Sequence, residues 1–451
     1  MVRLTRSLEG ETLRTGWKLH LPAIMIFISY VALVIFSRSR YSTELTLFFV
    51  LMALAYALVF GFFVYLWKQK KQLSVRYVFG WACLYHLLGL FGLPLFEDDY
   101  YRYLWDAYQT VQHGSPYGVA PSDYFDTAGL GASVSARFQS VLNGINYPDI
   151  PTIYGPTLQY SFLLAYFIAP GEVWALQLVY SLVDLALIAV LLKLSTPRLV
   201  LLYAWSPLVF KEVILTAHPD GLGVCFLMVA ILSYRRKAFY FMAVSLAGSL
   251  ASKVFAILFV PFLLFKTSFR VVVVFIVSLV ALYAPLLSDS AGDLLGLNAM
   301  AQSWQFNSAV YGLLTILFTA QTSKMILALV LMSGFGWYFY RFHFGLNSLK
   351  AKGHIRGDIM MGGFLLCAPV INPWYLVWVL PFAVIHKNIS AWVASVMVMM
   401  AYIIGLNIEG SDLLAYQQPV WVRLVEFSVI IGFMVLAFIP DKKILHKNLS
   451  K

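Results

Sequence analysis

The sequence predicts an all-α integral membrane protein, a polytopic helical bundle of about 12–14 transmembrane helices with a large first external loop that contains juxtamembrane helices. The first observation is composition: 61% of the 451 residues are hydrophobic and only 12% are charged, against about 25% charged in a typical soluble domain. The second is that apolar runs alternate with short basic clusters, and the third is one long acidic and aromatic segment. A soluble chain could not bury this much apolar surface, whereas lipid solvates it.

The apolar runs mark the expected spans, and several are shorter than the roughly 20 residues that an upright helix needs. They are 20–37, 44–67, 77–95, 173–193, 198–215, 220–235, 238–251, 254–266, 270–287, 323–341, 358–371, 374–386, 390–407 and 420–439. Two other apolar segments, Thr157–Pro170 and Ala309–Ala320, are short. If either crossed the membrane, the basic loops that follow it would lie on the outer side, against the positive-inside rule. We therefore expect both to lie along the outer membrane surface or to re-enter it.

The net charge of +11 favours membrane topology over nucleic-acid binding, because the basic residues gather in short loops between apolar runs. With these loops on the cytoplasmic side, both termini lie inside. Arg38 and Arg40 fall outside, without an explanation from the sequence. The predicted organisation is N-terminal transmembrane helices over 1–95, an external loop with juxtamembrane helices over 96–172 and a helical bundle over 173–451, within one membrane domain.

Polar and sulfur-containing residues within the apolar runs have simple expected roles. Cys83, Cys225 and Cys367 suggest small packed side chains rather than disulfides or a metal site. Asp184 lies in the middle of a span, where we expect an interhelical hydrogen bond to stabilise it.

The most informative motif is the run from Glu97 to Asp106, which begins where the third span ends. Three adjacent carboxylates at the edge of a low-dielectric region repel one another, so at least one pKa should rise, and such a group can accept a proton from a hydroxyl. On a helix starting here, Asp99, Arg102, Tyr103 and Asp106 would share a face, and Arg102 could pair with either acid. The alternative explanation is helix capping, since acids interact well with a helix N-terminus.

Two other segments place charges on the same predicted face. His218 and Asp220 belong to a His-Pro-Asp-Gly sequence, which an ordinary turn would also explain. Lys253 interrupts an apolar run against the charge bias, where a lipid phosphate would pair with it and snorkelling to headgroups is the alternative. The segments Trp304–Asn307 and Asn372–Tyr375 also face outward, and anchoring of aromatic side chains at the interface would account for both.

The run from Asp98 to Asp106, followed by His113-Gly114-Ser115-Pro116-Tyr117, resembles the first-loop signature of the GT-C membrane glycosyltransferases. It is most similar to the bacterial polyprenol-phosphate-mannose-dependent mannosyltransferases. Tyr154-Gly155-Pro156-Thr157-Leu158 is similar to a Tyr-Pro-Pro-Leu segment of that group, with Gly155 in place of the first proline. Ser206-Pro207, Glu212, His218-Pro219-Asp220, Lys253 and Asn372-Pro373-Trp374-Tyr375 follow in the group's order. Ala107 stands where relatives commonly have glycine.

The resemblance implies transfer of a sugar, with mannose favoured, from a polyprenyl-phosphate donor to a lipid or glycan acceptor, with inversion. The site would lie on the external, periplasmic face of a bacterial cytoplasmic membrane, in cell-envelope glycan biosynthesis. Asp99 would be the general base, with Asp98 as helper or substitute. Candidates for binding the donor phosphate or the substrate are Arg102, Lys253, His218, Asp220, Tyr103 and Asp106. No cofactor is required, and a divalent ion between Asp98 or Asp99 and phosphate remains open.

Three other classes would share the multiple spans. These are a polysaccharide-precursor polymerase, a flippase or other transporter, and a non-catalytic assembly subunit. Transporters tend to carry paired repeats and broken spans that meet near the midplane. This sequence shows no clear repeat, and its unusual charges gather on one predicted face, which favours an enzyme.

Overall fold

The computed structural model describes residues 17–126, 129–287, 292–345, 355–404 and 418–438. Within these ranges the regular structure is helical, and the one extended pairing is an isolated bridge between Phe306 and Val370. The chain divides into two compact units, Met1–Ser303 and Trp304–Lys451. The predicted division by membrane topology, at residues 95 and 172, stays a prediction.

The first unit contains a bundle of apolar helices. Its members are α1 (Trp17–Arg38), α2 (Leu45–Lys68), α3 (Val75–Gly89), α7 (Val173–Leu194), α8 (Pro197–Ala204), α10 (Asp220–Arg235), α11 (Phe239–Leu250) and α13 (Phe269–Tyr283). Neighbours in this bundle pack directly, as α1 does with α2 and α10 with α11. The Ser74 hydroxyl starts α3 by accepting from the backbone N–H of Tyr77, which is ordinary N-capping.

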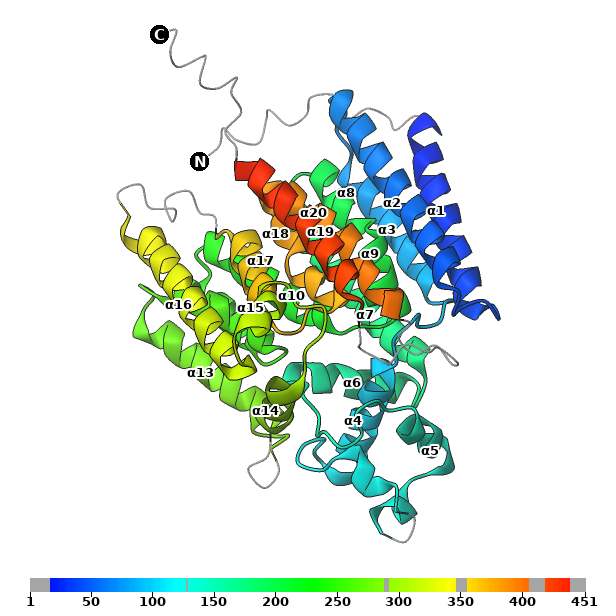
Figure 1. Ribbon diagram of the computed structural model, residues 1–451, viewed down its shortest axis with the longest axis vertical. Helices are drawn as coiled ribbons and strands as arrows, with labels where there is room; N and C mark the ends of the chain where they lie inside the picture. The colour runs from blue at the N-terminus through cyan, green and yellow to red at the C-terminus, as the bar shows by residue number, and fades with distance from the viewer. Residues whose placement is uncertain (1–16, 127–128, 288–291, 346–354, 405–417, 439–451) are drawn as a thin grey trace. The chain divides into compact units, whose positions relative to one another are not determined.

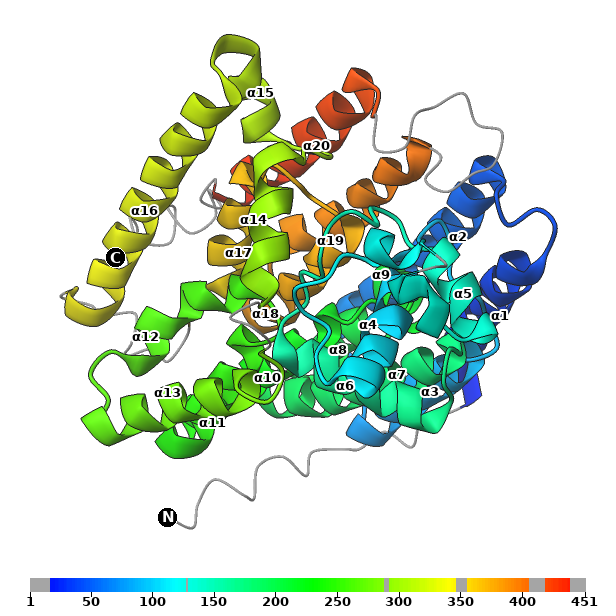
Figure 2. The same cartoon turned by 90° about the horizontal axis from the view of Figure 1, so that it is seen from below.

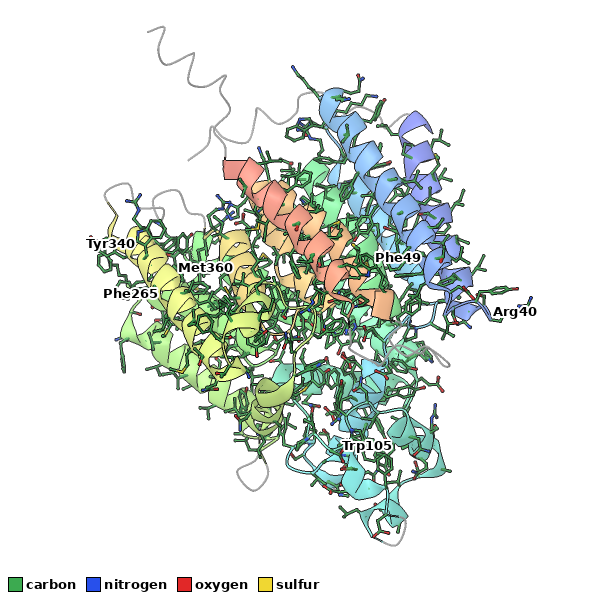
Figure 3. All side chains as sticks on the ribbon, in the orientation of Figure 1. Arg40, Phe49, Trp105, Phe265, Tyr340 and Met360 are labelled. Carbon is green, nitrogen blue, oxygen red and sulfur yellow. The ribbon has the colours of Figure 1, made fainter. Side chains whose placement is uncertain are left out.

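The long loop region between α3 and α7 is folded around its own core. It contains α4 (Asp99–His113), the 3₁₀-helices η1 (Pro121–Tyr124) and η2 (Leu130–Ser133), α5 (Ala136–Asn143) and α6 (Pro156–Ile168). Trp105 is buried inside this region (Figure 3) and packs its ring edge against Tyr124. In both ribbon views α4 lies beside α6, and Figure 1 shows α6 running across the direction of α1–α3. Gly114 ends α4 in the left-handed conformation, at φ 80°, as glycine commonly does.

The segment 198–215, predicted as one span, is broken. After α8 come α9 (Pro207–Val209) and a π-helical turn, η3 (Phe210–Leu215). Pro207 cannot continue a helix that includes the preceding residues without losing a backbone hydrogen bond, which explains the break. The remaining elements of this unit are η4 (Val254–Phe259), α12 (Val260–Leu264) and α14 (Asp293–Ser303).

The second unit is also helical. It contains α15 (Val310–Leu317), α16 (Ala320–Phe344), α17 (Gly357–Cys367), η6 (Pro373–Trp378), α18 (Leu380–His386), α19 (Ile389–Met397), η7 (Val398–Ile404) and α20 (Val420–Phe438). The two aromatic segments predicted to face outward lie together here. Phe306 exchanges backbone hydrogen bonds with Pro369 and Ile371, and the Asn307 side chain donates to Glu426 at 3.0 Å. These segments are therefore packed into the unit, beyond any anchoring role.

The surface of the helices confirms that the protein is an all-α polytopic membrane protein. Four helices are long and apolar enough to cross a membrane: Leu19–Arg38, Leu45–Lys68, Val173–Leu194 and Ala320–Phe344. Shorter apolar helices accompany them, while α16 turns large apolar side chains such as Leu329 and Met332 outward. Because lipid replaces water around such a surface, its exposure carries no penalty. The count of 12–14 spans stays a prediction.

Two polar features of the bundle have structural explanations. Asp184 on α7 accepts from Tyr203 at 2.7 Å and lies 2.8 Å from His86 Nε2, so the predicted interhelical hydrogen bond is confirmed. Arg38 donates a hydrogen bond to the backbone carbonyl of Phe91, just after the end of α3. Arg40 projects away from the end of α1 (Figure 3). The three cysteines are free and half-buried.

Candidate active site

The acidic motif lies at the start of α4, where the backbone turns sharply. Phe96, immediately before the motif, has φ 58°, a left-handed conformation that non-glycine residues seldom adopt. Asp98 occupies the N-cap position of α4, yet its side chain makes no capping hydrogen bond. Instead the Asn146 amide donates both to Asp98 and to Asp99, the latter at 3.1 Å. Simple helix capping therefore does not account for Asp98.

Asp99 combines partial access with protein contacts. Tyr154 Oη lies 3.4 Å from Asp99 Oδ2, and the side chain retains partial solvent exposure. The protein atoms around it raise the pKa of Asp99, against the opposing effects of the Asn146 hydrogen bond and the charges of Lys253 and Arg102. Burial also raises the pKa of Glu97. The predicted rise in this motif is confirmed, with desolvation as its main cause and repulsion among the acids as a smaller one.

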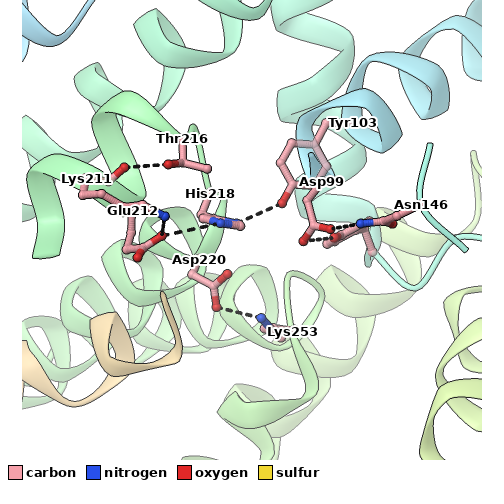
Figure 4. Close-up of polar contacts among 10 residues, drawn as sticks. Asp99, Tyr103, Asn146, Lys211, Glu212, Thr216, His218, Asp220 and Lys253 are labelled. Carbon is pink, nitrogen blue, oxygen red and sulfur yellow. Dashed lines mark hydrogen bonds and ion pairs between the residues drawn. The ribbon is translucent and has the colours of Figure 1, made fainter. Parts of the chain in front are cut away.

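Lys253 reaches the same polar cluster from the turn that follows α11 (Figure 4). Its ammonium lies 2.7 Å from Asp220 Oδ1 at the start of α10, and the lysine side chain is 19% exposed against 2% for the aspartate. An ammonium has three donors, and Asp220 accepts one of them here. Because the Lys253 side chain is partly exposed, its positive charge is accessible to an anion that approaches from the exposed side.

Gly155 allows the end of the loop to dock beside Lys253. A Cβ at this position would lie 2.2 Å from the carbonyl oxygen of Ala251, and Thr157 N–H donates to that same oxygen at 3.1 Å. Only glycine lets two backbones approach this closely. Its place in the Tyr-Gly-Pro-Thr-Leu segment thus has a steric reason.

His218 lies deeper than Lys253 and is fully buried. Its Nδ1 is 3.2 Å from Tyr103 Oη, and its Nε2 is 3.6 Å from Glu212 Oε2, which in turn is 3.2 Å from Lys211 Nζ. Burial, reinforced by the charges of Lys211 and Lys253, lowers the pKa of His218 well below its ordinary value. The imidazole is therefore neutral, and both ring nitrogens face protein groups.

Arg102 and Asp106 hold the loop instead of pairing with each other. The Arg102 guanidinium donates to the carbonyls of Ile150 at 2.9 Å and Tyr147 at 3.0 Å. Asp106 is buried and accepts from Thr152 and from Gln159, the latter at 2.8 Å; its burial raises its pKa to about 6. The predicted ion pair of Arg102 with Asp99 or Asp106 was wrong, because loop carbonyls occupy the donors that it would use.

The structure thus brings Asp98, Asp99, Tyr103, His218, Asp220 and Lys253 into one cluster. Figure 4 shows Asp99, Tyr103, His218, Asp220 and Lys253 together, whereas Arg102 and Asp106 contact the loop. Sequence reasoning missed Asn146, which carries no motif signal, and Lys211, whose place in an apolar run could have signalled a buried ion pair. Across the part of the chain that the structure describes, no group of three or more His, Cys, Asp or Glu side chains is arranged to hold a metal ion.

Comparison with known proteins identifies the family. The family model described as alpha-(1->6)-mannopyranosyltransferase, N-terminal domain, matches residues 24–269. This is more than half of the 451-residue chain, and it includes every residue of the cluster described above. No curated protein and no solved structure shows a significant match. The match over most of the first unit places this membrane protein among glycosyltransferases, and the chain belongs to the alpha-(1->6)-mannopyranosyltransferase family.

Proposed function

We propose that the protein transfers mannose from a polyprenyl-phosphate donor to a lipid or glycan acceptor on the outer face of the membrane. The observation that carries the proposal is that the Lys253 ammonium, held by Asp220, adds positive potential at a partly exposed carboxylate, Asp99, in one polar cluster. Family membership supports mannosyl transfer. The apolar helices around the cluster support a donor that is itself a lipid.

In the proposed mechanism Asp99 accepts the proton of the acceptor hydroxyl. The acceptor oxygen forms a bond to the anomeric carbon on the face opposite the phosphate, so the configuration inverts. The bond between that carbon and the phosphate oxygen breaks, and its electron pair leaves with the polyprenyl phosphate. Lys253 stabilises the negative charge that grows on this oxygen, while Asp98 orients the acceptor or substitutes as base.

Asp220 has a supporting role in this mechanism. Its carboxylate holds the Lys253 ammonium at 2.7 Å, so the lysine is oriented before substrate arrives. Preorganised charge of this kind is more effective than a flexible side chain, because no reorganisation is needed as the reaction proceeds. A divalent ion bridging Asp98 or Asp99 to the phosphate would be an alternative source of positive charge.

The donor class is tested with purified protein in lipid nanodiscs. Synthetic polyprenyl phosphates that carry mannose, glucose, arabinose or an amino sugar are supplied singly, with guanosine diphosphate mannose as the soluble comparison, and products are identified by mass spectrometry. We expect transfer from the polyprenyl-phosphate mannose and none from the nucleotide sugar. Transfer from the nucleotide sugar alone would contradict the proposed donor.

A second assay separates the enzyme from a transporter. The protein is reconstituted in vesicles that hold the lipid-linked sugar in one leaflet, and both cleavage and leaflet distribution are followed. The proposal expects the bond between sugar and phosphate to break when acceptor is present. Movement of the intact lipid-linked sugar between leaflets without cleavage would replace the enzyme with a flippase.

A further inference from the structure

Lys211 and Glu212 are two charged residues that have no role in the mechanism proposed above. Both side chains are fully buried, and they form an ion pair on the π-helical turn η3. Such turns are rare and occur frequently at functional sites. The wider turn is closed by the backbone N–H of Thr216 and of His218, which donate to the carbonyls of Lys211 and Glu212 at 3.0 and 2.9 Å.

The backbone after this turn is shaped to deliver His218. Ala217 has φ 59°, a conformation that costs free energy for a residue with a side chain and persists where the surroundings enforce it. The result is that His218 Nε2 faces Glu212 and Nδ1 faces Tyr103. Figure 4 shows the contacts running as a row from Lys211 through Glu212 and His218 to Tyr103, with Asp99 beyond Tyr103.

The charges of the row select one tautomer of His218. Nε2 lies 3.6 Å from the Glu212 carboxylate, slightly beyond hydrogen-bond distance, and this negative charge favours the tautomer with the ring proton on Nε2 and Nδ1 as the acceptor. Tyr103 must then donate its hydroxyl proton to Nδ1. The groups that face this row are Lys211 and Glu212 on η3, Tyr103 on α4, Glu97 before α4, Asp220 on α10 and Lys253 after α11.

Tyr103 is the link from this row to Asp99. Its ring stacks on Phe162, with centroids 4.8 Å apart, and meets the Tyr154 ring edge-on at 5.0 Å. The Tyr154 hydroxyl contacts Asp99. A hydrogen bond that fixes the Tyr103 hydroxyl therefore also holds the Tyr103 ring against Tyr154, whose hydroxyl contacts Asp99.

We propose that Lys211, Glu212 and His218 form a positioning triad, which holds one histidine tautomer and acts through Tyr103 and Tyr154 to orient the Asp99 carboxylate. The inference rests on the proposed role of Asp99 as base. It assigns His218 to positioning, in contrast to the direct contact with donor phosphate that the family resemblance implied. The two assignments differ in what they predict for KM.

The test compares Tyr103→Phe and His218→Gln with the wild type, using purified full-length protein and polyprenyl-phosphate mannose. Tyr103→Phe keeps both ring contacts and removes only the hydroxyl. We expect kcat to fall roughly 10- to 100-fold in each variant, with donor KM nearly unchanged. The double variant should be no slower than the slower single one, because both remove the same link.

Tyr30→Phe is the matched control, since Tyr30 is also fully buried, donates one hydrogen bond to the carbonyl of Trp205 and would keep its ring stack on Phe210 of η3. It should keep wild-type kcat. In the plot of kcat/KM against pH, the acid limb should move to higher pH in Tyr103→Phe and stay in place in Tyr30→Phe. A purely structural defect would lower kcat without moving the acid limb.

Three outcomes overturn the inference. Unchanged kcat and pH profile in Tyr103→Phe would show that the link is not used. A raised donor KM with little change in kcat for His218→Gln would return that residue to phosphate binding. Multiplying effects in the double variant would mean independent roles. Asp99→Asn is assayed alongside these variants. If Asp99→Asn loses activity and Tyr103→Phe does not, only the positioning triad is contradicted. If Asp99→Asn stays active, the proposed base and the triad are both contradicted.

Discussion

Asp99 differs from an ordinary surface carboxylate in what surrounds it. Asn146 and Tyr154 contact its two oxygens, while Lys253 and Arg102 contribute positive potential. The sequence predicted the acidic motif and a raised pKa, since three acids at a membrane edge are sufficient for that inference. It could not predict Asn146, because the amide lies far along a loop whose conformation depends on packing.

The first prediction concerns the base itself. Asp99→Asn keeps the size and much of the hydrogen bonding of the side chain but cannot accept the proton, so kcat should fall on the order of 10²–10⁴-fold. Asp149→Asn, an exposed acid of the same loop, serves as the control and should keep wild-type turnover. Sugar transfer is measured on well-folded protein. If Asp99→Asn and Asp98→Asn both turn over normally, neither acid is the base.

The second prediction follows from the raised pKa of Asp99. A base works only when deprotonated, so kcat/KM should fall as the pH drops through this raised pKa, at a higher pH than an ordinary aspartate would give. Tyr154→Phe removes a hydrogen bond that stabilises the charged form, and this change should raise the pKa further. The measurement is kcat/KM against pH for both proteins. An acid limb that moves to lower pH in the variant would contradict this account.

The third prediction concerns Lys253. A phosphate is charged in both the ground state and the transition state, so Lys253→Ala should raise the donor KM and also lower kcat. Loss of a charge-assisted hydrogen bond corresponds to roughly a 10- to 100-fold decrease in kcat/KM. Lys237→Ala, an exposed lysine at the other end of α11, is the matched control. A Lys253→Ala variant with normal donor KM would place the phosphate elsewhere.

At the level of elements, the sequence located most helices but not their interruptions. The start of α4 was expected from the end of the third apolar run, and a helix at α6 from the apolar segment Thr157–Pro170; the structure contains both. The π-helical turn η3 was missed because the segment 198–215 is apolar almost throughout, so the shift of about 100° that one inserted residue causes leaves no trace in the hydrophobic pattern. This turn positions Lys211, Glu212 and His218, so the missed feature lies next to the candidate site.

The fourth prediction tests how the loop docks. Gly155→Ala places a Cβ 2.2 Å from the Ala251 carbonyl oxygen, and neither backbone can yield without moving the turn that carries Lys253. We expect activity to fall at least 10-fold, since a displacement of about 1 Å at a reacting group can cost 10²-fold. Gly221→Ala, where the new Cβ would make ordinary contact at 3.7 Å with Val213, should remain active. Equal activity of both variants would show that the docking is not needed for catalysis.

For the whole molecule, composition was sufficient to predict the class, because a chain with 61% hydrophobic residues requires lipid as solvent. It was not sufficient to predict how the helices divide into two units, since that division depends on which apolar faces meet. Charge bias placed Asp99, Asp220 and Lys253 on one membrane face, and the structure brings the three into one cluster; the face itself stays a prediction. The contacts among them depend on loop docking at Gly155 and could not be predicted.

The last prediction concerns topology, and it depends on α6. If α6 lies along the outer surface without crossing, its two flanks are on the same side of the membrane. Asp149 precedes it and Glu172 follows it, and both side chains are exposed. Each is replaced by cysteine in a background that lacks Cys83, Cys225 and Cys367, and intact cells are treated with an impermeant maleimide. Both positions should react, whereas cysteines at Lys237 and Lys387, which the positive-inside rule places in the cytoplasm, should react only after permeabilisation.

Exposed positions are needed, since a cysteine in place of the buried His218 would resist the reagent on either side. Labelling at 149 but not at 172 would show that α6 crosses the bilayer, and the side assigned to every later loop, including those carrying Asp220 and Lys253, would then have to be reversed.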